Sequence, residues 1–480
     1  MVDTIAKKQK VEIRFLGRSS TEVTGSIILV ECPTGEKILL DYGLYQSPNL
    51  LEQYKVNTQK LDFKPSDITF VAISHLNIDH LGLIPKLLAD GANCPVYMYY
   101  PNIEFVPTML KDSAKIMDRD TITLKRRYKK EYKPIYNLED AENSLSHFLG
   151  CNKNEIIQIT ENIGIKFVPA GHIFGSTQIM LYIKSSSGHI DVISYSGDIG
   201  NIIFEQPFVE PFEPIIKSTV FIGECTYNNP LRSAKKEHRE KDLEVIKSVV
   251  TQTIDNKGMV LVPCFALQRM ETMLYTLWSI FGKDANFNTQ IVVDSPLAVE
   301  LLDRFEENLE GEYSKLLNVI LNWDNVKIIR TIEESQLCVE DSSPKIILSS
   351  SGMLTQGRSI LYLKKVLPKQ NCAIITCGYM ADGSLGKKIK DGKQKTITID
   401  NKAYPNRCSI HSLKSYSSHM QYEQLLSYYT NLANNGCKTI CLVHGDEGKI
   451  EFKKALEESI RRINKTTKVV AVNSDTVTRL

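Results

Sequence analysis

The sequence predicts an α/β protein that folds in two parts. The first hundred residues contain short segments rich in β-branched residues, each bounded by glycine, proline, aspartate or serine. From about residue 240, amphipathic helical segments alternate regularly with short apolar strands, which is typical of a parallel sheet covered by helices on both faces. The chain has 480 residues, 42% of them hydrophobic and 24% charged, so it is long enough to form two cores.

The first part begins with four strand-like segments, which read VEIRFLG, SIILVEC, KILLDYG and ITFVAISH. The next segment, LGLIPKLLADG, has a helical pattern and ends at Gly91, a residue type favoured just after a helix. The strand CPVYMYYP follows, and residues 104–150 are mostly helical in pattern. Strand patterns return in IIQIT, GIKFVPAGH and HIDVISYSGDIG.

The alternating block has the strands MVLVPCFA, IVVDSP, PKIILSSSG and AIITCGY. Helical patterns separate them, among them DLEVIKSVVTQTIDNKG, QRMETMLYTLWSIFG and LAVELLDRFEENLEG. The last 60 residues again contain helices and strands, in EQLLSYYTNLANNG, TICLVHG, EFKKALEESIRRI and TKVVAVN. We expect this last segment to complete the first part.

Composition excludes several classes of protein. No apolar run approaches the roughly 20 residues that span a bilayer, and the N-terminus lacks the apolar stretch of a secretory signal. We therefore expect a cytoplasmic protein without a membrane partner. The eleven cysteines are scattered without a C-x-x-C pair, which argues against a disulfide framework. The net charge of +2 neither demands nor excludes a nucleic-acid partner.

The segment SHLNIDHLG could bind a metal ion. It places His75, Asp79 and His80 directly after an apolar strand. Imidazole nitrogens and carboxylate oxygens are ligands that zinc prefers, and a catalytic zinc site keeps one position open for water. Taken alone, these histidines could equally be structural.

Three further segments carry the same kinds of ligand in the same setting. His172 follows the strand KFVPA, Asp198 follows DVIS, and His444 follows TICLV, each beside glycine. The carboxyl ends of strands are where the active sites of layered α/β folds collect. The sequence therefore predicts one metal site formed by several strand ends.

These motifs, taken in chain order, resemble those of the β-CASP nucleases of the metallo-β-lactamase fold. The matching segments are LLDYG at Asp41, HLNIDH, AGHIFGS, SGDIG, GECTY at Glu224, SYSSHMQ at His419 and LVHGD. Between them, VPCFALQR, VVDSPLA, SSSGMLTQGR and GYMADGSLGKKIKDG resemble cap-domain signatures of the prokaryotic RNA-processing members. The resemblance covers essentially the whole chain.

The resemblance implies a fold and a division into domains. The fold is an αββα metallo-β-lactamase sandwich with an inserted α/β cap, the β-CASP domain. Residues 1–227 would form the first part of the sandwich, residues 228–405 the cap, and residues 406–480 the completion of the sandwich. The resemblance also makes a homodimer plausible.

The resemblance also implies two zinc ions. His75 and His172 would bind one ion, and Asp79, His80 and His444 would bind the other. Asp198 would bridge the two. Asp41 would hold a ligating histidine in its orientation, as the outer partners of metal ligands commonly do.

The implied reaction is hydrolysis of a phosphodiester in single-stranded RNA by a metal-bound hydroxide. His419 would act as the general acid and Glu224 would support it; Asp79 and Asp198 are the other residues assigned to catalysis. The substrate contacts are assigned to Arg232, Arg269, Ser350, Ser351 and Gly352. The chemistry does not use the ribose 2′-hydroxyl, so only the resemblance favours RNA over DNA.

One residue departs from the family pattern at the predicted metal site. Asn77 stands where the family has a metal-binding histidine, and a neutral amide oxygen is a poorer zinc ligand than an imidazole. We expect the first zinc to bind weakly. Three explanations stay open: a natural enzyme with one tight and one weak metal, a natural inactive RNA-binding relative, and a deliberate substitution that traps substrate.

Other functions fit the same pattern less well. A scaffold protein could keep the fold with an inactive site, a DNA nuclease could use the same chemistry, and hydrolysis of a small ester or lactone is common to the wider fold. The cap signatures and the pairing of His419 with Glu224 argue against the last of these.

Overall fold

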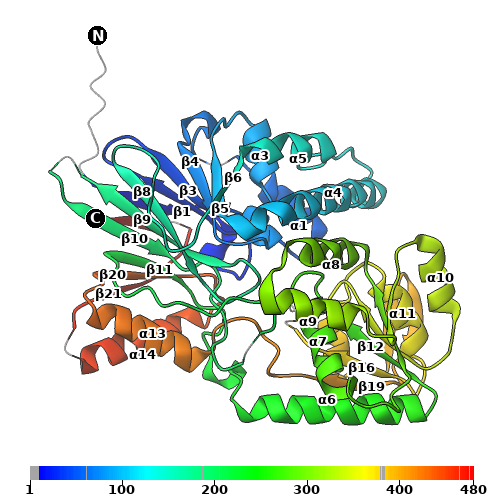
Figure 1. Cartoon of the computed structure of the whole chain (residues 1–480). Coiled ribbons are helices and arrows are strands. Elements are labelled where there is room, and N and C mark those ends of the chain that lie inside the picture. The colour runs from blue at the N-terminus through cyan, green and yellow to red at the C-terminus, as the bar shows by residue number, and fades with distance from the viewer. Residues whose placement is uncertain are drawn as a thin grey trace. The chain divides into compact units, whose positions relative to one another are not determined.

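The computed structural model describes residues 10–60, 62–185, 187–204, 206–378, 380, 384–463, 465–474 and 476–480. The chain forms two compact units, shown in Figure 1. The first unit contains the residues up to Ile202 together with Val209–Ser233 and Ser418–Leu480, and the second contains Ile203–Phe208 and Ala234–Ser417.

The first unit contains two mixed sheets. The first sheet has the order β22-β1-β2-β3-β4-β5-β6. Its strands are β1 (Glu12–Phe15), β2 (Ile27–Glu31), β3 (Lys37–Tyr42), β4 (Phe70–Ile73), β5 (Val96–Tyr99), β6 (Phe148–Cys151) and β22 (Val477–Arg479). Strands β22, β1, β2 and β3 pair antiparallel, whereas β3, β4, β5 and β6 pair parallel.

The second sheet has the order β21-β20-β11-β10-β9-β8-β7. Its strands are β7 (Ile157–Gln158), β8 (Ile163–Pro169), β9 (Thr177–Lys184), β10 (Ile190–Tyr195), β11 (Val220–Glu224), β20 (Thr439–Val443) and β21 (Lys468–Ala471). Strands β10, β11, β20 and β21 are parallel neighbours. The C-terminal segment therefore supplies strands to both sheets.

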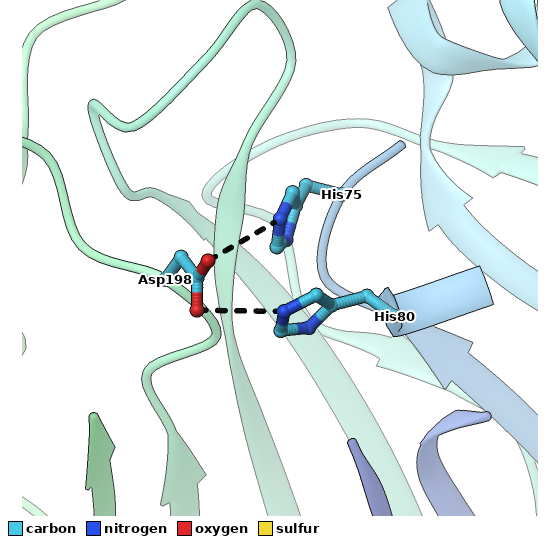
Figure 2. A group of neighbouring side chains, drawn as sticks. All are labelled: His75, His80 and Asp198. Atoms are coloured by element: carbon cyan, nitrogen blue, oxygen red, sulfur yellow. Dashed lines mark ion pairs between the residues drawn. The ribbon is translucent and has the colours of Figure 1, made fainter. Parts of the chain in front are cut away.

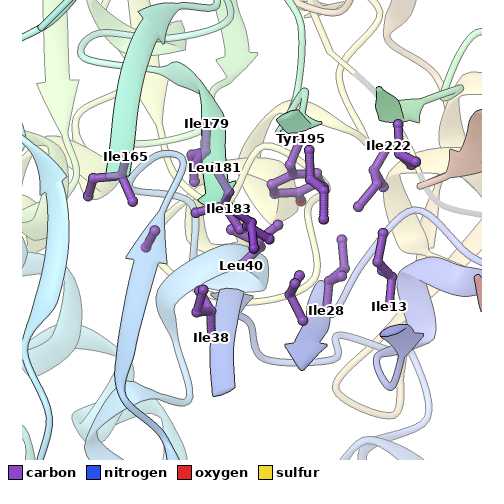
Figure 3. Packing of buried hydrophobic residues seen from close by; sticks show 14 of the residues in the cluster. Ile13, Ile28, Ile38, Leu40, Ile165, Ile179, Leu181, Ile183, Tyr195 and Ile222 are labelled. Atoms are coloured by element: carbon purple, nitrogen blue, oxygen red, sulfur yellow. The ribbon is translucent and has the colours of Figure 1, made fainter. Parts of the chain in front are cut away.

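A single hydrophobic core joins the inner faces of these two sheets (Figure 3). In β1, Ile13 and Phe15 are buried while Glu12 and Arg14 are partly exposed, as the two-residue period of a strand requires. Leu40 of β3 packs in the same cluster as Ile179 of β9 and Ile222 of β11. Burying each such side chain contributes about 1.5–3 kcal/mol to folding.

Helices cover the outer faces of the sandwich. The helices of this unit are α1 (Leu50–Asn57), α2 (Ile78–Leu81), α3 (Ile84–Ala89), α4 (Val106–Tyr128), α5 (Leu138–Ser144), α13 (Tyr422–Asn434) and α14 (Lys449–Arg462). Tyr429 of α13 and Phe452 of α14 share a second core with Phe221 of β11. Figure 1 shows α3, α4 and α5 gathered beside β4, β5 and β6. The unit thus has four layers, helices outside and sheets inside.

The second unit is built on a six-stranded parallel sheet with the order β14-β13-β15-β12-β16-β19. Its strands are β12 (Met259–Pro263), β13 (Gln290–Asp294), β14 (Val326–Ile328), β15 (Lys345–Ser349), β16 (Ala373–Thr376) and β19 (Ser409–Ser412), and β17 (Thr396–Ile399) and β18 (Lys402–Pro405) form a separate hairpin. Its helices are α6 (Glu237–Asp255), α7 (Arg269–Phe281), α8 (Pro296–Asn308), α9 (Gly311–Leu321), α10 (Ile332–Glu340), α11 (Ser359–Val366) and α12 (Leu385–Lys390).

The predicted α/β fold class is confirmed, and so is the parallel sheet expected from the alternating block. Strand β9, the hairpin and helix α9 were not predicted. All eleven cysteines are buried. A search of the described helices finds none that combines the length and apolar character needed to cross a bilayer. Part of the motif GYMADGSLGKKIKDG, at 379 and 381–383, lies outside the described residues.

Candidate metal centre

The predicted metal-binding side chains and Asp41, which was predicted to orient one of them, all lie in the first unit, at or just beyond the ends of its strands. Asp41 lies in the last part of β3, His75 follows β4, His172 follows β8, Asp198 follows β10 and His444 follows β20. Asp79 and His80 lie on the short helix α2, one turn beyond His75. Asp41 and His444 have positive φ values of 57° and 50°, a conformation that few residues other than glycine adopt.

Asp198 lies between two pairs of histidines. Its Oδ2 atom is 3.8 Å from His75 Nε2 and 3.6 Å from His172 Nε2. Its Oδ1 atom is 3.4 Å from His80 Nε2 and 3.4 Å from His444 Nδ1. Figure 2 shows the two carboxylate oxygens directed at His75 and His80 respectively. One carboxylate can therefore serve two metal positions.

Asp79 joins the group around His80 and His444. Its Oδ2 atom is 3.8 Å from His80 Nε2 and 3.6 Å from His444 Nε2. In each of three triads the ligand atoms lie within 4.8 Å of one another. The triads are His75, His80 and Asp198; Asp79, His80 and His444; and His172, Asp198 and His419.

Within the part of the chain that the structure describes, several of these ligand atoms are buried without a hydrogen-bond partner. They include His75 Nε2, His80 Nε2, His444 Nε2 and Asp198 Oδ1. Burying a polar atom without a partner is costly, and the cost is removed when the atoms share a cation. Imidazole nitrogens with carboxylate oxygens are a donor set that suits zinc. The residues present therefore fit zinc.

A second group of side chains holds the histidines in place. Asp41 Oδ2 is 2.6 Å from His80 Nδ1, and the Asp41 carboxylate also accepts hydrogen bonds from Ser74 and Tyr195. This bond directs His80 Nε2 towards Asp198, an arrangement common at metal-binding histidines. Thr226 Oγ1 lies 3.0 Å from His444 Nδ1 and positions that ring in the same way.

Burial and neighbouring charges set the protonation of the site. Burial lowers the pKa of His172 to about 3, and burial with the nearby His80 holds the pKa of His75 well below its usual value. Burial opposes the charged form of Asp198, but His444 and His80 outweigh it and keep its pKa well below the usual range. His75 and His172 are therefore neutral and Asp198 is charged, which are the states that bind metals.

His419 lies beside this site and pairs with a buried carboxylate. Its Nδ1 atom is 3.1 Å from Glu224 Oε1, and its ring centre is 4.5 Å from that of His172. Glu224 is fully buried and also accepts hydrogen bonds from the backbone of Ile199 and Thr226. Burial disfavours the imidazolium form, but Glu224 outweighs burial and raises the pKa of His419 to about 9. The imidazole is therefore protonated at neutral pH.

Asn77 lies at the turn that carries His75, Asp79 and His80. It is the residue before α2, with extended backbone angles of −63° and 138°. An asparagine at this position usually accepts a hydrogen bond from the first turn of the helix, but the side chain of Asn77 makes no such bond. The amide is thus not used to cap the helix.

The residues predicted to contact substrate lie in both units. Arg232, in the first unit, forms a 2.7 Å ion pair with Asp446. The other four lie in the second unit: Arg269 begins α7, and Ser350, Ser351 and Gly352 follow β15. Ser350 Oγ is 2.6 Å from Ser295 Oγ.

The supporting residues Ser74, Tyr195 and Thr226 were not predicted from the sequence. Ser74 directly precedes His75, which is the one local signal that could have pointed to it. Their hydroxyl groups form hydrogen bonds with Asp41 or His444. These contacts exist only because the ends of several strands meet at this place.

Comparison with known proteins finds three matching family models. Residues 20–198 match the metallo-beta-lactamase superfamily, residues 270–389 the Beta-Casp domain, and residues 403–469 the Zn-dependent metallo-hydrolase RNA specificity domain.

Similar proteins match over most of the chain. Ribonuclease TTHA0252 of Thermus thermophilus is 26% identical over 90% of this chain and 93% of its own length. Transcription termination factor FttA of Methanocaldococcus jannaschii is 28% identical over 97% of this chain and 71% of its own length. The RNase J-like protein of the same organism is 29% identical over 87% of this chain and 89% of its own length.

Proposed function

Because the chain belongs to the β-CASP family of metallo-β-lactamase-fold proteins, we propose that it is a zinc-dependent nuclease that hydrolyses phosphodiester bonds in single-stranded RNA. The observation that carries this proposal is the placement of Asp198, whose two carboxylate oxygens face two different pairs of histidines. The match to an RNA specificity domain at residues 403–469 favours RNA as the substrate.

Two zinc positions would share Asp198. His75 and His172 would hold the first ion, and Asp79, His80 and His444 would hold the second. When bound, two such ions lower the pKa of a water molecule and stabilise the charge that develops on the phosphoryl oxygens. The unpartnered atoms of the site support this arrangement, because they otherwise leave several buried polar groups unsatisfied.

His419 would donate a proton to the oxygen that leaves when the phosphodiester breaks. Hydrogen bonding of Nδ1 to Glu224 leaves Nε2 as the atom that delivers the proton. The buried carboxylate stabilises the imidazolium form, so a proton is available at neutral pH. Glu224 is held by two backbone N–H groups, which fixes the direction of the imidazole ring.

Asn77 would leave the first zinc position with fewer strong ligands than the second. The first position has two imidazoles and one carboxylate oxygen, whereas the second has two imidazoles and oxygens from two carboxylates. An amide oxygen adds less than an imidazole nitrogen would. We expect the first ion to bind more weakly and RNA cleavage to be slower than in an Asn77→His variant.

The test is a side-by-side measurement of zinc content and cleavage of a labelled single-stranded RNA. Asn77→His should raise the zinc content towards two ions per chain and increase the cleavage rate. Asn143→His, an exposed change on α5, should alter neither and serves as the matched control. Two full zinc equivalents in the unmodified chain would contradict the proposed effect of Asn77.

The same experiment separates an enzyme from an RNA-binding protein with an inactive site. If Asn77→His reaches two zinc ions and still binds RNA without cleaving it, the chain is a binding protein. If the variant cleaves single-stranded DNA and not RNA, the proposed substrate is wrong.

A further inference from the structure

The end of helix α4 and the residues after it carry a dense group of basic side chains, which we call the α4 basic segment (Lys125–Lys133). Six of its nine residues are lysine or arginine, and Glu131 is its one acidic residue. All six basic side chains are exposed to solvent. The net charge of the whole chain is only +2, so this segment concentrates positive charge at one place.

Packing against the rest of the first unit fixes the shape of the α4 basic segment. Leu124 is 1% exposed and Tyr128 is half-buried, so this face of α4 points towards the protein and the three basic residues between them point towards solvent. Beyond the helix, the ring of Tyr132 packs edge-on against Tyr54 of α1, with 5.1 Å between the ring centres. The basic side chains therefore project from a folded surface.

Most of these charges have no acidic partner. Among the described residues, the α4 basic segment forms a single ion pair, between Lys125 Nζ and Glu131 Oε1 at 2.6 Å. The guanidinium carbon of Arg127 is 5.6 Å from the centre of the Tyr128 ring, a contact that does not neutralise its charge. The segment thus presents five cations to solvent that no described carboxylate pairs with.

The dipole of the helix explains only part of this pattern. Cations stabilise the C-terminal end of a helix, and the effect falls off within the last turn. It can account for Lys125, Arg126 and Arg127, which lie in the last turn of α4. The three lysines at and beyond the helix end lie outside that turn, and closely spaced like charges repel one another. A bound polyanion would relieve this repulsion.

Helix α4 begins beside the candidate metal centre and ends well away from it. The ring of Phe105, the residue before α4, is 5.1 Å from that of Phe174, which lies two residues after the predicted ligand His172. Asn102 donates a 2.8 Å hydrogen bond to the Gly175 carbonyl of the same loop. A helix rises about 1.5 Å per residue, so the basic segment of this 23-residue helix starts roughly 30 Å further along it (Figure 1).

We propose that the α4 basic segment binds the phosphates of a single-stranded RNA whose cleaved bond lies at the metal centre. Lysine and arginine side chains bind the phosphates of nucleic acids, and such contacts position a strand without reading its sequence. The match to an RNA specificity domain favours RNA over other polyanions. This inference rests on the proposed function and deepens it, because it means that the enzyme holds long RNA more tightly than short RNA.

The first experiment measures RNA binding by fluorescence anisotropy at several salt concentrations, and a gel checks that the RNA remains intact. The labelled RNA has about 30 nucleotides, more than the roughly 4–16 that one binding site covers. The triple variant Arg126→Gln, Arg127→Gln and Lys130→Gln should weaken binding about tenfold. The slope of log Kd against log salt concentration should fall by about 2, because each phosphate contact on a single strand contributes about 0.7.

A second triple variant is the matched control. Lys454→Gln, Arg461→Gln and Arg462→Gln remove the same charge from exposed positions of α14, a different helix of the first unit. This control should bind RNA almost as tightly as the unmodified chain. The proposal is overturned if the α4 variant keeps the affinity and the salt slope of the unmodified chain, or if both variants lose the same affinity, because net charge alone would then explain the loss.

The second experiment compares cleavage of the same long RNA with cleavage of an RNA of about five nucleotides, which is no longer than one small binding site. For the long RNA, the α4 variant should raise KM about tenfold and leave kcat unchanged, since a remote phosphate contact binds substrate and transition state equally. For the short RNA, both constants should stay as they are in the unmodified chain. An equal change for the two lengths would overturn the proposal.

The two experiments also distinguish this proposal from the proposed function. An unmodified chain that cleaves neither RNA would contradict the proposed function, and the binding measurement would still test the α4 basic segment. An unmodified chain that cleaves both RNAs, together with an α4 variant that binds and cleaves them equally well, would overturn the α4 proposal alone.

An anionic membrane is the alternative partner for this surface. Ile122 lies one turn before Arg126 and is 57% exposed, and an apolar side chain beside basic ones also suits a membrane surface. Sedimentation with vesicles that contain phosphatidylserine tests this alternative. Sedimentation that is lost in the α4 variant, together with unchanged RNA binding, would overturn the RNA proposal and assign the surface to a membrane.

Discussion

The buried carboxylates Asp198 and Asp294 have opposite surroundings. Asp198, in the first unit, is 3% exposed, and its Oδ1 atom has no hydrogen-bond partner. Asp294, at the end of β13 in the second unit, is fully buried and accepts hydrogen bonds from Ser335, Tyr362 and Arg358. Among the described residues, the first carboxylate contacts the histidines of the candidate metal centre and keeps one oxygen without a hydrogen bond, whereas the second is fully hydrogen-bonded.

This difference separates a ligand site from a structural network. Buried polar groups in folded proteins are nearly always paired, and the unpaired Oδ1 atom of Asp198 lies among imidazole nitrogens that also lack partners, which is the pattern of ligands that share a cation. By this criterion Asp198 differs from Asp294, whose partners are hydroxyl groups and an arginine of its own unit. The criterion predicts that changes at Asp198 affect function and changes at Asp294 affect folding.

The largest expected effect is that of Asp198→Asn on catalysis. The neutral amide removes the charge shared by two zinc positions, and metal ions contribute several kcal/mol to such reactions. RNA cleavage should fall by about 1000-fold or more, with a parallel loss of bound zinc measured by elemental analysis. Asp191→Asn, on the neighbouring strand β10, should leave both unchanged. Full activity in Asp198→Asn would contradict the proposed site.

The second effect is that of Asp294→Asn on stability. Asparagine cannot neutralise Arg358, which is 15% exposed, and breaking a buried pair costs about 3–5 kcal/mol. Urea unfolding should show this loss in the free energy of unfolding of the second unit. Asp303→Asn breaks an exposed pair with Arg330 and should cost at most about 1 kcal/mol. Equal costs in the two variants would contradict the comparison.

The third effect concerns Glu271 and depends on pH. Burial raises the pKa of Glu271 from 4.5 to about 8. Below pH 4.5 the carboxyl is protonated in both the folded and the unfolded chain, and its contribution to the free energy of unfolding is fully present. This contribution declines above pH 4.5 and is lost as the pH rises through about 8. Holding the charged carboxylate in this buried place costs up to a few kcal/mol, so Glu271→Gln should be more stable than the unmodified chain at pH 9 by about that amount.

Thermal unfolding at pH 5 and pH 9 checks this difference. The two chains should melt at similar temperatures at pH 5 and diverge at pH 9. Glu312→Gln, an exposed change on α9, should show no such divergence. If Glu271→Gln destabilises the protein at both pH values, the carboxyl has partners that the side-chain geometry does not reveal.

Much of the candidate site could be predicted from the sequence, because its side chains follow strand ends. His75, His172, Asp198 and His444 each stand just after an apolar strand, and the structure brings them together. His419 was identified through the family resemblance alone. The roles of these residues stay predictions, since the geometry shows proximity and not activity.

Other features depend on contacts between distant segments. The parallel sheet of the second unit was predicted from the alternation of helices and strands, but its strand order was not. The strand order depends on which strands pair, and no local sequence pattern indicates this pairing. For the same reason, the hydrogen bonds that link Tyr195 to Asp41 and Asp41 to His80 became visible only in the structure.

The smallest expected effect is that of Asp41→Asn. This variant tests how much the zinc affinity depends on a residue that orients a metal ligand without being predicted to bind the metal. Asp41 contacts the predicted zinc ligand His80 through a 2.6 Å hydrogen bond, and its other hydrogen-bond partners among the described residues are Ser74 and Tyr195. Asparagine keeps the size of the side chain and tolerates the positive φ of 57° at this position. Any change therefore reports the loss of the carboxylate charge.

Loss of such a partner typically weakens metal binding by about 10- to 100-fold. Zinc affinity should therefore fall in Asp41→Asn by less than it does in Asp198→Asn, measured by competition with a chelating dye. Asp67→Asn, which breaks an ion pair with Lys37 at the protein surface, should leave zinc affinity unchanged. A loss in Asp41→Asn as large as that in Asp198→Asn would mean that Asp41 is needed to form the site and does more than orient His80.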